Sequence, residues 1–254
     1  MSVRFDGSTD GYSATTGLPG TAFTALCWGR IAVDRNAYST FLSIDNNSAS
    51  QVLAIQTDTP GNDPYLWMEP YGVGWIDETP AIVMTVGSWY RMVVSRNGTA
   101  INYYLATATG AVSSGAGTLS GALTATRLRV GQSPNTGEWL NGNVANLKVY
   151  SATLTLAEIA AEWDNWQAQR TADLLRHHKW QTAAETTDYS GNGWALTAAG
   201  TPTFEATNPA ISDSPPATAT PLRIGTAAPT ALRVGASPIA RAYIGSTRVW
   251  GAAP

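Results

Sequence analysis

The chain has 254 residues, of which 44% are hydrophobic and 13% are charged, whereas about 25% of the residues in an average soluble domain are charged. This length allows one all-β domain, or one domain with an appendage, and either can bury a sizeable core. The net charge of −3 excludes broad electrostatic attraction to nucleic acid or to an acidic membrane. With 24 glycines and 14 prolines, the composition favours turn-rich β structure over a helical bundle.

The first 150 residues alternate short apolar runs with turn signals, a rhythm that is typical of a β-sandwich or jelly roll. Asn97-Gly98 predicts a two-residue hairpin. The stretch 107–126, rich in Ala, Gly, Ser and Thr, is either a loose loop or an irregular edge strand. The only cysteine, Cys27, is expected to be a buried, inert thiol. Strands are predicted at residues 3–5, 23–33, 39–44, 51–56, 65–69, 82–85, 89–96, 100–106, 128–131 and 144–150.

A helix is predicted next, at about residues 155–170. Thr155 and Glu158 form the pattern of a capping box, and Ile159 and Trp163 follow at helical spacing. The helical pattern extends towards residue 180, so His177 and His178 are expected at the surface near a helix end.

Several landmarks occur in the order found in one known family. Phe5-Asp6-Gly7, the run from Phe23 to Trp28, and the run from Gly87 to Gly98 resemble the opening and core strands of laminin G-like domains. The resemblance covers about residues 3–165 and implies an all-β fold, a concanavalin A-like (laminin G-like) jelly-roll sandwich with one short helix. The segment Asp188-Tyr-Ser-Gly-Asn-Gly, which opens such domains, here follows the helix. Residues 181–208 therefore either pair back onto the sandwich or begin a truncated second unit.

The last part of the chain differs in kind, because residues 209–254 hold seven of the fourteen prolines. A ten-residue period is visible at 222–225, 232–235 and 242–245, and each unit predicts one short strand that needs neighbours for stability. The run from Ala242 to Trp250 resembles a short module of bacteriophage virion proteins. We therefore predict a jelly roll at 1–208 and, at 209–254, a small β-repeat tail that anchors the protein in an assembly. The apolar residues expected to carry this anchoring are Ile224, Val234, Tyr243, Ile244, Val249 and Trp250.

Catalytic signals are weak. The Glu-x-Asp-x-x-Glu pattern of jelly-roll glycosidases is missing, and the adjacent Asp77 and Glu78 face opposite ways in a strand. The two histidines are also adjacent, and no Gly-rich phosphate loop follows a strand. The chain is therefore predicted not to be an enzyme.

Two kinds of ligand site remain open. No cofactor is expected, but Asp188 and Asn192 either form an ordinary turn or hold a calcium ion, as related laminin G-like folds do at a rim. The second is a group of five aromatic residues, which form either a glycan platform, a subunit interface or part of the strand core. Its members are Tyr65, Trp67, Tyr71, Trp75 and Trp139.

The predicted function is a non-enzymatic structural protein of a phage virion, a capsid decoration protein or a tail or fibre component. Its partners would be other virion proteins, and we expect a homo-oligomer with neither nucleic-acid binding nor membrane insertion. The N-terminus lacks the pattern of a signal peptide, so synthesis in the host cytoplasm is expected. A virion adhesin that recognises host glycans is the alternative, and a polysaccharide-degrading enzyme is a less favoured one.

Overall fold

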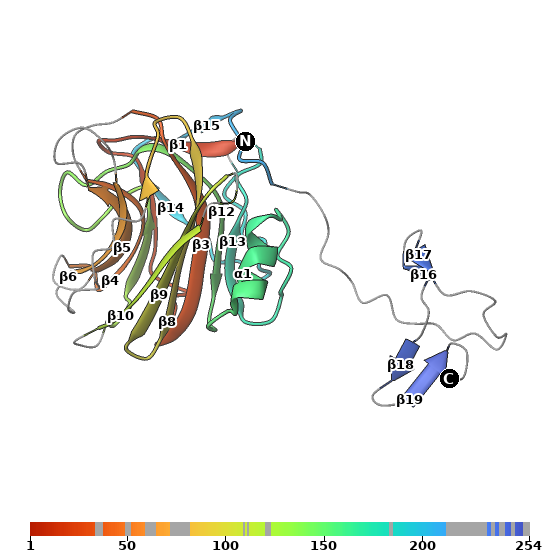
Figure 1. The fold of residues 1–254 in the computed structure, drawn as a ribbon. Helices are drawn as coiled ribbons and strands as arrows, with labels where there is room; N and C mark the ends of the chain where they lie inside the picture. The colour runs from red at the N-terminus through yellow and green to blue at the C-terminus, as the bar shows by residue number, and fades with distance from the viewer. Residues whose placement is uncertain are drawn as a thin grey trace. The chain divides into compact units, whose positions relative to one another are not determined.

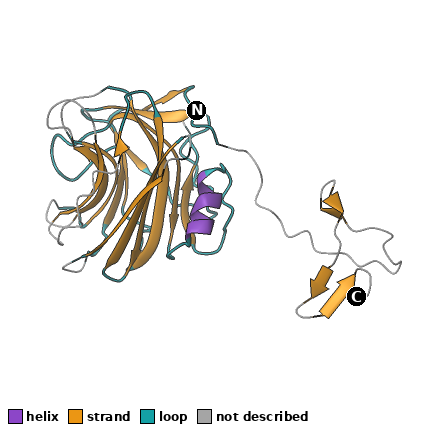
Figure 2. Ribbon diagram, viewed as in Figure 1, coloured by secondary structure: helices purple, strands orange, loops and turns teal. Residues whose placement is uncertain are grey.

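The chain divides into two compact units, Met1–Pro216 and Ala217–Pro254, and each is described by itself. Most regular structure is β-strand (Figure 2). No helix of the described residues combines the length and the apolar character needed to span a membrane. The computed structural model describes residues 1–33, 38–48, 52–58, 65–71, 82–108, 110, 112–119, 123–182 and 185–211, and the short strands at 233–234, 237–238, 242–244 and 247–250.

Two antiparallel sheets lie face to face in the first unit (Figure 1). Sheet A contains β1 (Ser2–Asp6), β3 (Ala22–Ile31), β8 (Trp89–Asn97), β9 (Ala100–Thr107), β10 (Val112–Thr118), β12 (Asn141–Tyr150), β13 (Leu174–His178) and β15 (Thr203–Glu205). Sheet B contains β2 (Gly11–Ala14), β4 (Ser39–Asp45), β5 (Val52–Asp58), β6 (Tyr65–Tyr71), β7 (Ile82–Val83), β11 (Arg127–Val130) and β14 (Thr197–Ala199). The described strands run β10-β9-β8-β3-β12-β1-β15 in sheet A, with β13 also beside β12, and β14-β2-β11-β4-β5-β6-β7 in sheet B. The predicted jelly-roll sandwich is confirmed.

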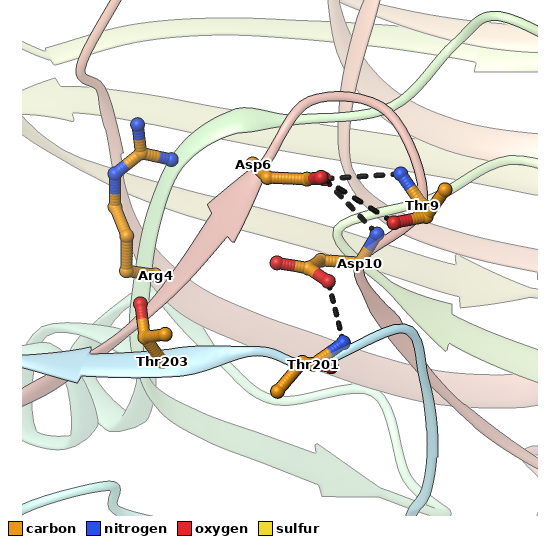
Figure 3. Close-up of a pocket in the computed structure, with 6 residues that line it drawn as sticks. All are labelled: Arg4, Asp6, Thr9, Asp10, Thr201 and Thr203. Carbon is orange, nitrogen blue, oxygen red and sulfur yellow. Dashed lines mark hydrogen bonds between the residues drawn. The ribbon is translucent and has the colours of Figure 1, made fainter.

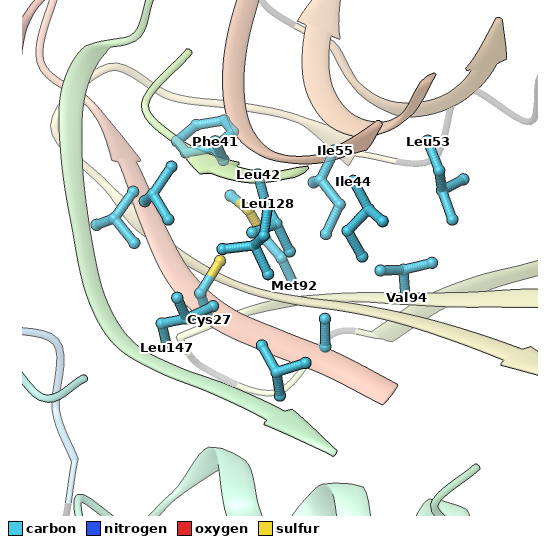
Figure 4. Close-up of a cluster of buried hydrophobic side chains, with 14 of the residues drawn as sticks. Cys27, Phe41, Leu42, Ile44, Leu53, Ile55, Met92, Val94, Leu128 and Leu147 are labelled. Carbon is cyan, nitrogen blue, oxygen red and sulfur yellow. The ribbon is translucent and has the colours of Figure 1, made fainter. Parts of the chain in front are cut away.

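Inward-facing side chains of both sheets form one hydrophobic core. Figure 4 shows Ile44 and Leu128 of sheet B opposite Cys27 and Leu147 of sheet A. Burial raises the pKa of the Cys27 thiol to about 12. Because the thiolate is the reactive form, Cys27 is an inert core residue, as predicted.

Helix α1 (Leu156–Trp163) covers the outer face of sheet A (Figure 1). The predicted capping box is present: the Glu158 N–H donates to the Thr155 hydroxyl, and the Glu158 carboxylate accepts the Thr155 N–H at 2.8 Å. Ile159 and Trp163 pack on a second cluster that includes Leu26 of β3. Strand β3 is therefore buried on both faces.

The helix ends at Trp163 rather than near residue 170. Two side chains of sheet A meet carbonyl groups at its end: the Trp28 indole donates to the Trp163 carbonyl at 2.8 Å, and Lys148 Nζ donates to the Asn165 carbonyl at 2.8 Å. Further along the chain, residues 174–178 form strand β13, which pairs with β12. The predicted surface position of His177 and His178 is wrong, because this pairing buries both side chains.

The segment after β13 returns to the sandwich, so the pairing-back alternative is correct. Strand β14 pairs with β2, and β15 pairs with β1. Strands β1 and β13 both pair with the same edge of β12, one after the other. Residues 141–144 of β12 pair with β1, and residues 147–150 pair with β13. The closing segment thus fills the place beside the first strand of the chain.

A buried arginine fastens this closing segment to the loop between β2 and β3. The Arg176 guanidinium donates to the carbonyl groups of Thr16, Gly17 and Trp194. The Trp194 ring lies against Gly17, where φ is +59° and where a Cβ atom would overlap the ring. Glycine is therefore required at this contact for two reasons, backbone conformation and space.

In the second unit, the described strands form two antiparallel pairs. Strand β16 (Arg233–Val234) pairs with β17 (Ser237–Pro238), and β18 (Ala242–Ile244) pairs with β19 (Thr247–Trp250). Two of the three repeated units, 232–235 and 242–245, thus contain a short strand. The unit at 222–225 lies outside the described residues.

Candidate functional site

An open, polar pocket of about 440 Å³ lies beside β1, between the loop that follows it and the chain that leads into β15 (Figure 3). The pairing of β1 with β15 brings these distant segments together and sets Thr203 opposite Arg4. The lining offers hydroxyl groups, carboxylates and one guanidinium group. Its residues are Arg4, Asp6, Thr9, Asp10, Thr201 and Thr203.

Asp6 organises the loop that forms one wall. Its Oδ1 accepts the backbone N–H groups of Ser8 at 2.8 Å, Thr9 at 3.0 Å and Asp10 at 3.1 Å, and its Oδ2 accepts the Ser8 hydroxyl at 2.5 Å. Burial acts to raise the pKa of Asp6, but the hydrogen bonds from Ser8 and from the backbone outweigh it and hold the pKa well below its usual range. Asp6 is therefore a fixed anion whose oxygens already serve the loop.

Asp10 is the most deeply placed carboxylate of the pocket, with 6% of its surface exposed. One oxygen accepts the Thr201 N–H at 2.7 Å. The chain approaches so closely here that a Cβ atom on Gly200 would overlap the Asp10 carboxylate. The second oxygen points into the space that Asp6, Arg4 and Thr203 surround (Figure 3), and no described residue donates a hydrogen bond to it.

Arg4 forms the opposite wall. Its Nη2 donates to Asn141 Oδ1 at 2.5 Å, and its Nε lies 3.4 Å from a carboxylate oxygen of Glu205. Burial lowers the pKa of Arg4, and the negative charge of Glu205 opposes this change. The guanidinium is held in place by its neighbours on β12 and β15, so one wall of the pocket is preorganised.

The pocket has the groups needed to bind a ligand rich in hydroxyls. The free oxygen of Asp10 can accept a hydrogen bond, and the hydroxyls of Thr201 and Thr203 can both donate and accept. The free Asp10 oxygen faces the open pocket, so a ligand donor can reach it directly. The geometry therefore fits a neutral, polar molecule better than an apolar one.

Asp188 and Asn192 lie away from this pocket, in the loop that covers β13. Asp188 Oδ1 accepts the N–H groups of His177 and Ser190, each at 3.0 Å, and Oδ2 accepts the Trp194 N–H at 3.0 Å. The Asn192 amide donates to the Leu174 carbonyl at 2.9 Å. These contacts favour the turn interpretation, because a calcium ion would compete with them for the Asp188 oxygens.

Among the described residues, no group of three or more His, Cys, Asp and Glu side chains is placed to hold a metal ion. Calcium binding at Asp188 and Asn192 stays a prediction.

The predicted aromatic group is only partly described. Tyr65, Trp67 and Tyr71 lie on β6, whose backbone alone is described, and Trp75 lies outside the described residues. Trp139 is half-buried and forms an isolated bridge with Thr40 of β4. The proposed platform therefore stays a prediction, and none of its members lines the pocket.

The predicted assembly residues lie in the second unit. Val234 is in β16, Tyr243 and Ile244 are in β18, and Val249 and Trp250 are in β19, whereas Ile224 lies outside the described residues. Only the backbone of these strands is described, so the anchoring role stays a prediction.

Comparison with protein families adds to the geometry. The model of the concanavalin A-like lectin/glucanases superfamily, of laminin G type, matches residues 6–160, which is more than half of the chain. The chain belongs to this superfamily. The match includes the β1–β2 wall of the pocket but ends before Thr201 and Thr203. None of the curated proteins matches the chain significantly.

Several solved structures are similar to this chain. A putative carbohydrate binding protein from Bacteroides ovatus has a TM-score of 0.51 and 12% identity, over 81% of this chain and 60% of that one. Tailspike protein 2 from Escherichia coli O157:H7 bacteriophage CAB120 has a TM-score of 0.46 and 14% identity, over 63% of this chain. The chain spans 23% of the tailspike's length. At these identities the likeness concerns the fold alone.

Proposed function

We propose that the protein is a non-enzymatic structural protein of a tailed-bacteriophage virion, a capsid decoration protein or a tail or fibre component. The second unit would join it to other virion proteins while the jelly roll is displayed. The observation that carries this proposal is the contrast between the two units. The first has 11 basic and 18 acidic residues, a net charge of −7, and the second has four arginines and no acidic residue, a net charge of +4.

The strands of the second unit support an assembly role. A single two-stranded hairpin is marginally stable in water, and β16–β17 and β18–β19 are each described as two strands only. Their stability would increase if another subunit supplied a neighbouring strand. The resemblance of the run from Ala242 to Trp250 to a phage virion module points in the same direction.

Contacts of the carboxylates support a non-enzymatic role. A glycosidase needs a carboxylic acid whose pKa is raised, beside a second carboxylate. In the pocket, Asp6 has the opposite property, because five hydrogen bonds stabilise its anion. Asp45 is likewise engaged, by Arg129 at 2.9 Å.

Deletion of Pro221–Pro254 should leave a soluble, folded jelly roll that no longer joins its particle. The reason is that all the core residues that the structure describes belong to the first unit. Circular dichroism and thermal unfolding would check the fold, and quantitative mass spectrometry of purified particles would measure occupancy. A variant in which a Gly/Ser segment of equal length replaces 221–254 controls for chain length. Incorporation of either variant at full occupancy would rule out the anchoring role.

The pocket favours a second candidate function, a virion adhesin that binds a host surface glycan. If a glycan screen identifies a ligand, Asp10→Asn should weaken its binding roughly 10- to 100-fold, because a hydrogen bond to a charged group is lost. Asn retains an oxygen for the Thr201 N–H, so the fold should persist. Asp164→Asn, at an exposed aspartate near α1, is the matched control.

The aromatic alternative can be separated in the same titrations. If Trp67→Ala and Trp75→Ala weaken glycan binding and Asp10→Asn does not, the platform binds the ligand and the pocket does not. If all three variants bind as the unchanged protein does, neither site recognises the glycan.

A further inference from the structure

The jelly roll protects most of its sheet edges from other strands. Among the described strands, β7 has two residues, and β14 and β15 have three each. Short edge strands are one means by which proteins prevent edge-to-edge association. The outer edge of β13 is covered by the loop 188–192, in which Tyr189 N–H donates to the His177 carbonyl and Asn192 donates to two further β13 carbonyls.

Strand β10 lacks this protection. It is seven residues long, it pairs with β9 over its whole length, and no described strand pairs with its other edge. Its sequence, Val-Ser-Ser-Gly-Ala-Gly-Thr, contains no charged residue and no proline. Charge and proline are the other common means of blocking an edge. Within the part of the chain that the structure describes, the outer backbone groups of β10 are therefore available to another strand.

The described side chains of β10, at residues 114–118, are short and leave this edge unobstructed. Ser114, Ala116 and Thr118 are exposed on one face and carry no long side chain that would obstruct an approaching strand. On the other face, Gly115 lies opposite Tyr103, and a Cβ atom at 115 would overlap the Tyr103 ring. The glycine therefore lets a core aromatic side chain lie directly beside the edge.

We propose that β10 is a self-docking edge, at which two copies of the chain pair antiparallel around a twofold axis near Gly115. An antiparallel strand pair is self-complementary under a twofold axis, which is the commonest symmetry of protein dimers. The seven-residue strand is centred on residue 115, and in this register Ser114 of one copy faces Ala116 of the other. The uncharged edge also lets two first units, each with a net charge of −7, meet without opposing like charges at the contact.

The test uses the full chain and a pair of charged variants, S114K/A116K and S114E/A116E. Like charges directly opposite each other destabilise a strand pair, so each variant should dimerise roughly tenfold or more weakly than the unchanged chain in sedimentation velocity. An equimolar mixture of the two variants should recover dimers, because a lysine of one copy then faces a glutamate of the other across the axis. Both substitutions lie on exposed positions, and unchanged thermal unfolding would verify the fold. T197K, at the short edge strand β14, is the matched control and should dimerise normally.

Cross-linking gives a second measurement. The variant S114C/A116C should form a covalent dimer on oxidation, and Cys27 should not interfere because it is buried. A chain that is monomeric at all concentrations would overturn the proposal. So would dimers that persist in both charged variants, or a mixture that fails to recover them, because the contact would then lie elsewhere or involve a different protein. None of these outcomes depends on the proposed virion role.

Discussion

Substitution of Glu162 by alanine is expected to lower the free energy of unfolding by about 3–5 kcal/mol, because it leaves a buried ammonium group without its counter-charge. Glu162 Oε2 lies 2.7 Å from Lys148 Nζ, and both side chains are fully buried between α1 and β12. Burial lowers the pKa of Lys148 to about 8, and the charge and hydrogen bond of Glu162 oppose this change. The same carboxylate accepts the Arg170 N–H at 2.6 Å, so the loop after α1 also loses a contact.

Urea unfolding at pH 7 would measure this loss, with Asp164→Asn as the control. Asp164 forms an ion pair with Arg91 at 2.6 Å, but its side chain is 54% exposed, so its substitution should change stability by less than about 1 kcal/mol. If Glu162→Ala cost no more than this control, the buried pair would not be what holds the helix against sheet A.

The contrast between the two ends of α1 explains what the sequence could predict. The start of the helix was predictable because its cap is local: Thr155 and Glu158 are three residues apart and satisfy each other. The end was not, because its carbonyl groups meet Trp28 and Lys148, which lie on strands far away in the sequence. Apolar spacing alone therefore extended the predicted helix beyond Trp163.

The same distinction, between local signals and contacts with distant residues, applies to the strands. Runs with several apolar residues, such as those at 23–33 and 144–150, were predicted because they carry the core. Strand β2 was missed because only four residues pair there, and β13 was mistaken for helix because its partner, β12, is not visible in local spacing. For strand β10, the sequence is compatible with either a loop or an edge strand, since a stretch of Ala, Gly, Ser and Thr has no hydrophobic period.

Only one wall of the pocket, the wall that contains Asp6 and Asp10, carries a signal in the sequence. Asp6 belongs to the landmark Phe5-Asp6-Gly7, and Asp10 follows it four residues later. Thr201 and Thr203 carry no signal of their own, and they join the pocket only through the register of β15 against β1. The family match ends at residue 160, so it does not contain these two residues either.

The free energy of unfolding is expected to decrease as the pH falls, already at pH values well above those at which carboxylates titrate. The reason is that His177 and His178 are buried in neutral form. Burial lowers the pKa of His177 to about 3, with the charges of Lys148 and Lys179 adding to the effect, and burial lowers the pKa of His178 to about 4. The reference value for both is 6.5. As the pH falls below 6.5, the unfolded chain takes up two protons that the folded chain does not, so stability decreases.

The expected slope is about 1.4 kcal/mol per pH unit for each histidine, which amounts to about 4 kcal/mol at pH 5. This is a large part of the 5–15 kcal/mol that is usual for a domain. Urea unfolding at pH 7.5, 6 and 5 would measure it. Asp6, Asp188 and Glu158 also have lowered pKa values, but their contribution is lost mainly below about pH 4.5, so the range from 6.5 to 5 isolates the histidines.

One variant separates the two histidines. His178 stacks on Trp180 with ring centroids 5.8 Å apart, so His178→Phe should retain the stack and remove one titrating group. The slope between pH 6.5 and 5 should then fall to about half. An unchanged slope would mean that His178 does not contribute, and a flat profile in the unchanged protein would mean that both histidines accept protons in the folded state.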